Sequence, residues 1–178
     1  TLFRSITPSS ILARPQSYDG SEKIGPLVVS NSVLFVQDQG RAVRDLTYQI
    51  DADGFAGEDL TILSRHLFEG KRIVDWAYAK TPDSIIWMVM DDGSVLSLTF
   101  IRSQKLVGWT RHDFGGFVES VTAVPEDGIF KVYFLIRRQI DGVDRYYVEQ
   151  MQDRHLDEPA DSFFLDSAVT FDEPAPTT

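Results

Sequence analysis

The chain has 178 residues and a formal net charge of −10, with 43% hydrophobic and 25% charged residues. This composition indicates a chain that can fold, and no apolar run approaches the roughly 18 residues that a membrane-spanning helix needs. The sequence contains no cysteine, which excludes disulfides, zinc–thiolate sites, iron–sulfur clusters and thiol catalysis. The acidic balance also argues against binding nucleic acid through its phosphates.

The first 26 residues are expected to form an extended N-terminal segment. Pro8, Pro15 and Pro26 lie in this stretch. Each proline restricts the residue before it to extended conformations, which disfavours a helix.

Residues 27–151 contain a repeating pattern of an apolar strand, a turn with acids and glycine, and a second apolar strand. The turn glycines Gly40, Gly93 and Gly142 recur at intervals of roughly 50 residues. Asp92-Gly93 and Asp141-Gly142 are strong hairpin turns, because glycine readily adopts the positive φ that tight turns need. The pattern predicts three blade-like β units at about 27–69, 73–114 and 117–151.

Antiparallel units repeating at this spacing are typical of β-propeller blades. We therefore expect an all-β fold of repeated antiparallel blade-like sheets, partial and β-propeller-like, because propellers close with four to eight blades. A β-sandwich is the alternative, since evenly spaced strands fit that fold as well. An open array of either kind has sheet edges that need partners.

One segment departs from the strand pattern and predicts one short helix. Residues 58–68 place Leu60, Leu63 and Leu67 at helical spacing, with acids at the start and Gly70 after the end. An amphipathic helix lying against a sheet is expected here.

Residues 152–178 are expected to form an acidic, proline-containing C-terminal segment with one strand. The segment holds seven acids and one base, so most of the net charge lies here. An apolar island at 163–171 predicts the strand and needs a sheet edge, or a following element, to bury it. The chain starts without methionine and stops just after this island, which favours a fragment of a longer chain.

The candidate chemical residues are scattered. His66, His112 and His155 lie far apart, without the local pairing of metal ligands. The acids of residues 51–59 lack EF-hand spacing and predict a polar loop. Asp91 and Asp92 resemble a carboxylate pair, but they occupy a hairpin turn in which Asp is common.

We expect no enzyme activity and no catalytic, cofactor-binding or metal-binding residues. No phosphate-binding loop, nucleophile elbow or zincin motif is present. Trp76, Trp87 and Trp109 could form a carbohydrate-stacking platform, although burial in the core is favoured because their strands are apolar. A hydrolase would depend on scattered groups such as Asp91 and His112.

Seven segments occur in a recognisable order along the chain. They are 33–37 with Gly40 and 43–46, then 59–68, 85–93, 98–100, 108–112, 146–151 and 164–171. Together they resemble tail proteins of tailed bacteriophages, of the tail-nozzle or tail-tubular-protein-B-like type. The resemblance covers about residues 7–172 and depends on the ordered set rather than on one motif.

This resemblance implies a structural subunit of a bacteriophage or prophage virion. The implied location is the virion tail, after synthesis in the cytoplasm of the bacterial host. The implied partners are other tail subunits, with a homo-oligomeric ring in the full-length protein, and neither nucleic acid nor membrane insertion is expected. The alternative is a receptor- or glycan-binding β module, which the aromatic content and the loops after each hairpin suggest.

Overall fold

The computed structural model describes residues 19–50, 53–152 and 168, and within them the predicted all-β fold is confirmed. Most of the expected N-terminal and C-terminal segments, with His155 and all of the predicted strand at 163–171 except Ala168, lies outside the described residues. The strands are β1 Leu27–Val29, β2 Ser32–Val36, β3 Val43–Gln49, β4 Gly54–Ala56, β5 Ile73–Ala79, β6 Ile85–Met90, β7 Val95–Ile101, β8 Leu106–His112, β9 Phe117–Glu126, β10 Ile129–Ile140 and β11 Val143–Gln150.

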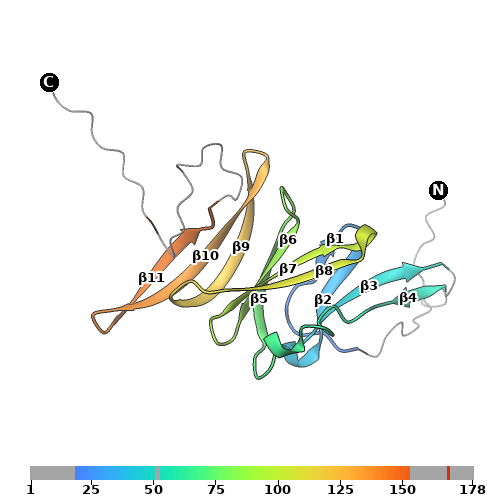
Figure 1. The fold of residues 1–178 in the computed structure, drawn as a ribbon, viewed down its shortest axis with the longest axis horizontal. Coiled ribbons are helices and arrows are strands. Elements are labelled where there is room, and N and C mark those ends of the chain that lie inside the picture. Colours follow the sequence, from blue (N-terminus) through green and yellow to red (C-terminus); the bar gives the residue numbers. More distant parts are fainter. Residues whose placement is uncertain (1–18, 51–52, 153–167, 169–178) are drawn as a thin grey trace, which may run out of the picture.

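These strands form three antiparallel sheets, each built from consecutive strands (Figure 1). Sheet 1 has the order β1-β2-β3-β4, sheet 2 has β5-β6-β7-β8, and sheet 3 has β11-β10-β9. Neighbouring strands pair antiparallel throughout. Repeated antiparallel sheets are therefore present, and their arrangement is consistent with both the blade-like expectation and the sandwich alternative.

Glycine is required at the turn between β6 and β7. Gly93 has a φ of 78°, which L side chains rarely adopt. A Cβ atom built on Gly93 would lie 2.5 Å from the ring of Phe117, at the start of sheet 3. The Asp-Gly turn predicted from the sequence thus also allows sheets 2 and 3 to approach.

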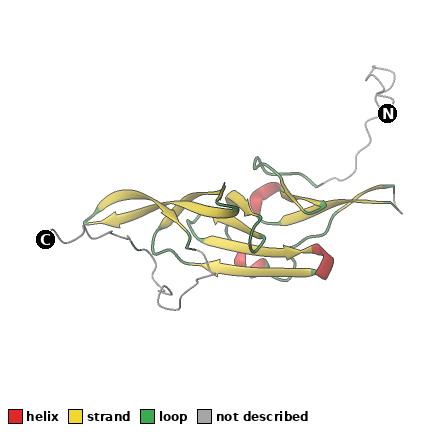
Figure 2. Cartoon of the chain, turned by 90° about the horizontal axis from the view of Figure 1, so that it is seen from above, coloured by secondary structure: helices red, strands yellow, loops and turns green. Residues whose placement is uncertain are grey.

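Sheet 2 is the middle layer, and both of its faces are buried. All six residues of β6 are buried, with side chains alternating between the two faces. Ile86, Met88 and Met90 pack in one core with sheet 1 residues such as Leu34. The alternate residues of β6 pack in a second core with sheet 3 residues such as Phe134. Figure 2 shows the same sheets from above, with short helical turns at their margins.

The predicted amphipathic helix at 58–68 is wrong. The described residues have turns at 60–63 and a single 3-10 turn, η2 Arg65–Leu67. Leu60 is buried, but Leu63 is 92% exposed, so the leucines do not share one face. Asp59 forms a β-bridge with Arg44, and the Leu60 N–H donates to the carbonyl of Val43. This pairing with β3 holds the start of the segment extended and prevents helix formation.

Because β6 is covered on both sides, shortening one of its side chains should leave an internal cavity. We expect Met88→Ala to lower the free energy of unfolding by about 2–5 kcal/mol. Leu63→Ala is the control and should change it by no more than about 0.5 kcal/mol, since Leu63 is exposed. Urea denaturation followed by tryptophan fluorescence measures both values, and equal stabilities would contradict the buried position of β6.

Candidate functional site: the outer faces of the sheet stack

The outer face of sheet 1 carries apolar side chains. Val29, Leu34 and Val36 point into the core, so the alternate residues of these strands point outward. Val28, Val33 and Leu46 are directly paired across three strands on this outward face. Val28 is 68% exposed. Further along this face, the exposed rings of Tyr48 and Phe55 meet edge to face at 5.4 Å. We call these five residues the sheet 1 face.

The outer face of sheet 3, at the other end of the stack, carries apolar side chains beside the ion pairs of Arg137 with Glu119 and Asp144. Val132, Phe134 and Ile136 point into the core, which leaves Tyr133 and Leu135 on the outward side of β10. Leu135 is paired with Val148, and the adjacent outward residue of β11 is Tyr146. Val148 is 73% exposed and Tyr146 is 61% exposed. We call Tyr133, Leu135, Tyr146 and Val148 the sheet 3 face.

Charged side chains fix sheet 1 to sheet 2. Asp45 on β3 is buried and pairs with Arg102, which follows β7 in the 3-10 turn η3 Arg102–Gln104. The Arg102 guanidinium also donates to Ser32 Oγ at 3.0 Å. The other carboxylate oxygen of Asp45 accepts the Glu58 N–H at 2.7 Å. A buried carboxylate is costly unless it is paired, so this cluster ties the two sheets together.

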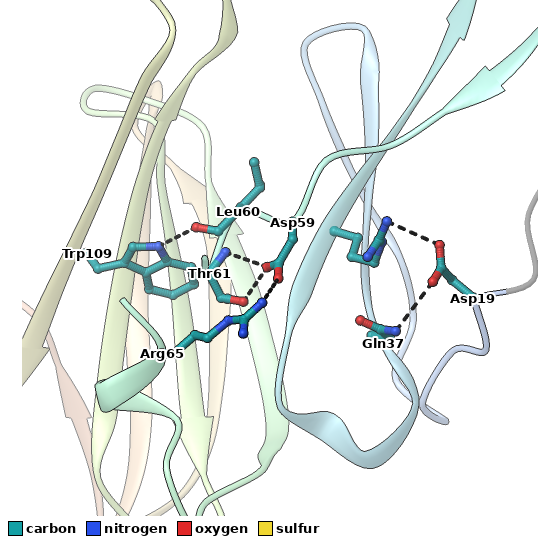
Figure 3. Close-up of polar contacts among 8 residues, drawn as sticks. Asp19, Gln37, Asp59, Leu60, Thr61, Arg65 and Trp109 are labelled. Carbon is teal, nitrogen blue, oxygen red and sulfur yellow. Dashed lines mark hydrogen bonds and ion pairs between the residues drawn. The ribbon is translucent and has the colours of Figure 1, made fainter. Parts of the chain in front are cut away.

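The segment after β4 makes a second connection between these sheets (Figure 3). The carbonyl of Leu60 accepts a hydrogen bond from Trp109 Nε1 on β8 at 2.9 Å. Asp59 accepts from the Thr61 backbone N–H at 2.8 Å and pairs with Arg65 at 3.6 Å. On the sheet 1 side, Asp19 accepts from Gln37 at 3.4 Å. These polar groups stabilise the fold and form no open site.

The three tryptophans lie within the stack rather than on a binding platform. Trp76 and Trp87 are buried, and Trp109 is partly buried with its ring edge-on to Phe68 at 4.9 Å. Trp76 Nε1 donates to the carbonyl of Gly25 at 2.7 Å, which satisfies its polar atom. The interpretation of these residues as core is confirmed for Trp76 and Trp87.

The two described histidines, His66 and His112, lie on different elements. His66 is exposed in η2, and His112 is on β8. His112 Nε2 lies 2.8 Å from Ser97 Oγ, and its ring packs against Trp87 at 4.8 Å. A serine–histidine pair can act in nucleophilic catalysis only if substrate reaches the hydroxyl. Ser97 is buried, so this pair is better explained as internal hydrogen bonding.

Asp91 and Asp92 point to different partners instead of forming a carboxylate dyad. Asp91 accepts from the backbone N–H of Arg72 at 3.0 Å and from its guanidinium at 3.3 Å. Asp92 pairs with Lys71 at 2.7 Å and accepts from Ser94. Burial raises the pKa of Asp92, but hydrogen bonds from Lys71 and Ser94 and the charge of Lys71 outweigh it and lower the pKa to about 2. Both acids anchor the start of β5 to the β6–β7 turn.

In the described part of the loop before β4, Asp53 has a hydrogen-bond partner within the fold. Asp53 accepts a hydrogen bond from the Tyr48 hydroxyl at 2.6 Å, while Asp51 lies outside the described residues. Among the residues that the structure describes, no group of three or more His, Asp or Glu side chains could hold a metal ion. The same part of the chain has no helix that is long and apolar enough to cross a membrane.

A cavity of about 300 Å³ lies where sheets 2 and 3 meet, close to Gln152. Ile85, Trp87 and Phe130 supply apolar walls, and Asp83 and Lys131 are its charged side chains. Lys131 is paired with Glu126 at 3.2 Å. The cavity therefore combines apolar walls with a cation that already has a partner, and it contains neither Ser97 nor His112.

Comparison with known protein families finds no family that matches this chain, and no curated protein matches it either. The geometry of the outer faces is therefore the structural basis for a functional proposal.

Removing Arg102 should leave Asp45 buried with an uncompensated charge. We expect Arg102→Met to lower the free energy of unfolding by about 3 kcal/mol, near the lower limit for breaking a buried pair, because Arg102 is itself 39% exposed. Arg65→Met removes an exposed pair and should cost less than about 0.5 kcal/mol. Adding Asp45→Asn to Arg102→Met should restore part of the loss. Identical urea midpoints for the two single variants would contradict this role.

The lowered pKa of Asp92 predicts a dependence of stability on pH. The carboxylate stabilises the fold above its ordinary pKa near 3.8, and this contribution is lost as the pH falls through about 2. Asp92→Asn should therefore be less stable than the wild type at pH 5, and the difference should shrink as the pH falls to 2 and vanish below it. The difference should stay below about 1 kcal/mol because the side chain is partly exposed. Lys71→Met should show a weaker form of the same pH dependence. If the difference in stability between wild type and Asp92→Asn were the same at pH 5 and pH 2, the proposed contribution of Asp92 would be excluded.

Proposed function

We propose that this chain is a structural module of a bacteriophage or prophage tail, an assembly module of a nozzle- or tube-like protein. In this proposal it lies in the tail of the virion, its partners are other tail subunits, and the longer protein forms a homo-oligomeric ring. The observation that carries the proposal is the pair of apolar faces at the two ends of the sheet stack.

Sheet 2 provides a comparison for the apolar side chains at the two ends of the stack. Each face of sheet 2 is covered by another sheet, and the resulting cores include fully buried side chains such as Met88 and Phe134. The sheet 1 face and the sheet 3 face carry the same kind of side chain but remain exposed at Val28 and Val148. Large exposed apolar patches commonly mark protein–protein contact sites. A stack with two such ends is suited to assembly.

The virion assignment has a separate support, the ordered resemblance of seven sequence segments to tail proteins. Several of those segments coincide with structural elements that define the stack. Residues 85–93 include β6, the fully buried strand, and residues 108–112 include Trp109, which donates to the carbonyl of Leu60 in the segment between sheets 1 and 2. The resemblance therefore falls on residues that determine sheet packing, as expected for a structural protein.

The alternative of a glycan-binding module gains no support from the described residues. Such sites stack sugars on exposed aromatic faces, whereas Trp76 and Trp87 are buried and Trp109 is partly buried. The exposed aromatic residues include Tyr48, Phe55 and Tyr146, and their rings suit contact with another protein as well as with a ligand.

Particles produced by the strain that encodes this chain provide the test. An antibody raised against the chain should label the tails of purified particles in immunogold electron microscopy, and should detect the chain in the particle fraction. Particles from a deletion strain are the control. Antigen found only among unassembled proteins of the lysate, with unlabelled tails, would refute the proposal.

The role of the sheet 1 face can be tested in the same system. We expect the double variant Val28→Asp/Tyr48→Asp to fold normally but to enter particles at least tenfold less than the wild type, because it places charge on the sheet 1 face. Leu63→Asp is the matched control, since Leu63 is as accessible but lies in the segment between sheets 1 and 2. Equal incorporation of all three proteins would show that the sheet 1 face is not an assembly surface.

A further inference from the structure

Among the described residues, sheet 3 has one strand fewer than the other two sheets. In this part of the chain sheets 1 and 2 each have four strands, while the edge strand of sheet 3 is β11, Val143–Gln150. β11 is exposed along nearly its whole length of eight residues, whereas the edge strands of sheet 1 have three residues each. It contains no proline and pairs with β10 without a bulge. A long edge strand of this kind is a template for pairing with another chain.

The backbone groups available at this edge follow from the hairpin. Asp141 and Gly142 both have positive φ, so Ile140 and Val143 close a two-residue turn. Antiparallel strands alternate between residues bonded to the partner and residues facing away. The Met151 N–H donates to the carbonyl of Val132 at 2.8 Å, which fixes the odd-numbered residues as those bonded to β10. The outward backbone groups therefore belong to residues 144, 146, 148 and 150.

We propose that β11 pairs antiparallel with β11 of a second copy of this chain, about a two-fold axis at Tyr147. This register places Tyr146 opposite Val148 of the second copy, and Asp144 opposite Gln150. All four of these residues have outward N–H and C=O groups, so they can form hydrogen-bonded pairs. The result is a continuous six-stranded sheet made from two copies of sheet 3.

The side chains favour this register over its neighbours. With the axis at Tyr147, Arg145 of one copy lies opposite Glu149 of the other, twice by symmetry. Shifting the axis to the residue before or after Tyr147 places Arg145 opposite Tyr147 or Met151, and the charge match is lost. Glu149 is already oriented by Arg138, whose Nη2 lies 3.2 Å from Oε2, so its position is set before the second copy binds.

The apolar side chains on the outward side of β11 also favour the register with its axis at Tyr147. Tyr146 and Val148 lie next to Leu135 on the sheet 3 face and are its most exposed members. The register at Tyr147 sets the Tyr146 ring against Val148 of the second copy, and cross-strand aromatic–aliphatic pairs stabilise sheets. This self-association does not depend on the tail assignment, because it uses only groups of sheet 3.

Sedimentation equilibrium of the purified full chain tests the proposal. We expect a monomer–dimer equilibrium with a dissociation constant on the order of 10 µM, typical of a small contact. Arg145→Glu, which sets two like-charged pairs across the axis, should weaken dimerisation at least tenfold. Arg111→Glu is the matched control, since Arg111 is an exposed residue on β8, the edge strand of sheet 2, and it should leave the dimer unchanged.

Amide hydrogen exchange distinguishes β11 pairing from other contacts. The amides of Tyr146 and Val148 should exchange rapidly at low protein concentration and slowly at high concentration. The amides of Arg145 and Tyr147, bonded to β10, should be protected at both concentrations. The charge swap Arg145→Glu/Glu149→Arg should regain dimerisation relative to Arg145→Glu alone.

Two results would overturn the proposal. One is a wild-type chain that stays monomeric at about 200 µM, 20 times the expected dissociation constant. This would be seen if another part of the chain, or another protein, paired with β11 instead. The other is a dimer that Arg145→Glu does not weaken, or in which the Tyr146 and Val148 amides gain no protection. Neither result bears on the labelling of phage tails, so the tail proposal fails or stands separately.

Discussion

The rest of the structure depends on the burial of sheet 2 on both faces. A sheet covered on one side alternates apolar residues, which face the core, with polar residues, which face water. β6 has no polar face to present to water. Its two sets of side chains need two covering layers, which sheets 1 and 3 supply. The three sheets are therefore mutually required, and the described part of the chain folds as a stack rather than as independent hairpins.

Polar groups determine how the layers sit on one another. Apolar faces pack without strong directional preference, so two sheets could slide or rotate with little change in buried area. Asp45 with Arg102, and Trp109 with the carbonyl of Leu60, connect defined points of sheets 1 and 2. On the other side of sheet 2, Asp75 Oδ2 accepts the Val121 N–H at 3.0 Å. These directional contacts fix the register of the stack.

The sequence was informative wherever local chemistry determines structure. The repeated apolar strands of residues 27–151 predicted an all-β fold, and Asp92-Gly93 and Asp141-Gly142 predicted tight turns, because both effects act within a few residues. The helix at 58–68 was wrong because helical periodicity counts only neighbours, whereas Asp59 pairs with Arg44 and Leu60 bonds to Val43. The Asp45–Arg102 pair had no signal at all, since the two residues are distant in sequence and nothing local couples them. The outer faces could not be predicted either, because alternation shows that a strand has two faces but not which one a neighbouring sheet will cover.

The strongest candidate chemical groups among the described residues are engaged in contacts within the fold. An active site holds charged or nucleophilic groups where substrate can reach them, with geometry that is completed only by the substrate. Here the strongest candidates already have partners in the fold: Ser97 with His112, Asp91 with Arg72, and Asp92 with Lys71. What the fold leaves exposed is apolar surface on the outer faces of sheets 1 and 3 and a row of backbone groups along β11. The proposed assembly role depends on these features: the apolar side chains on the two outer faces, and the backbone groups along β11 at the sheet 3 end of the stack.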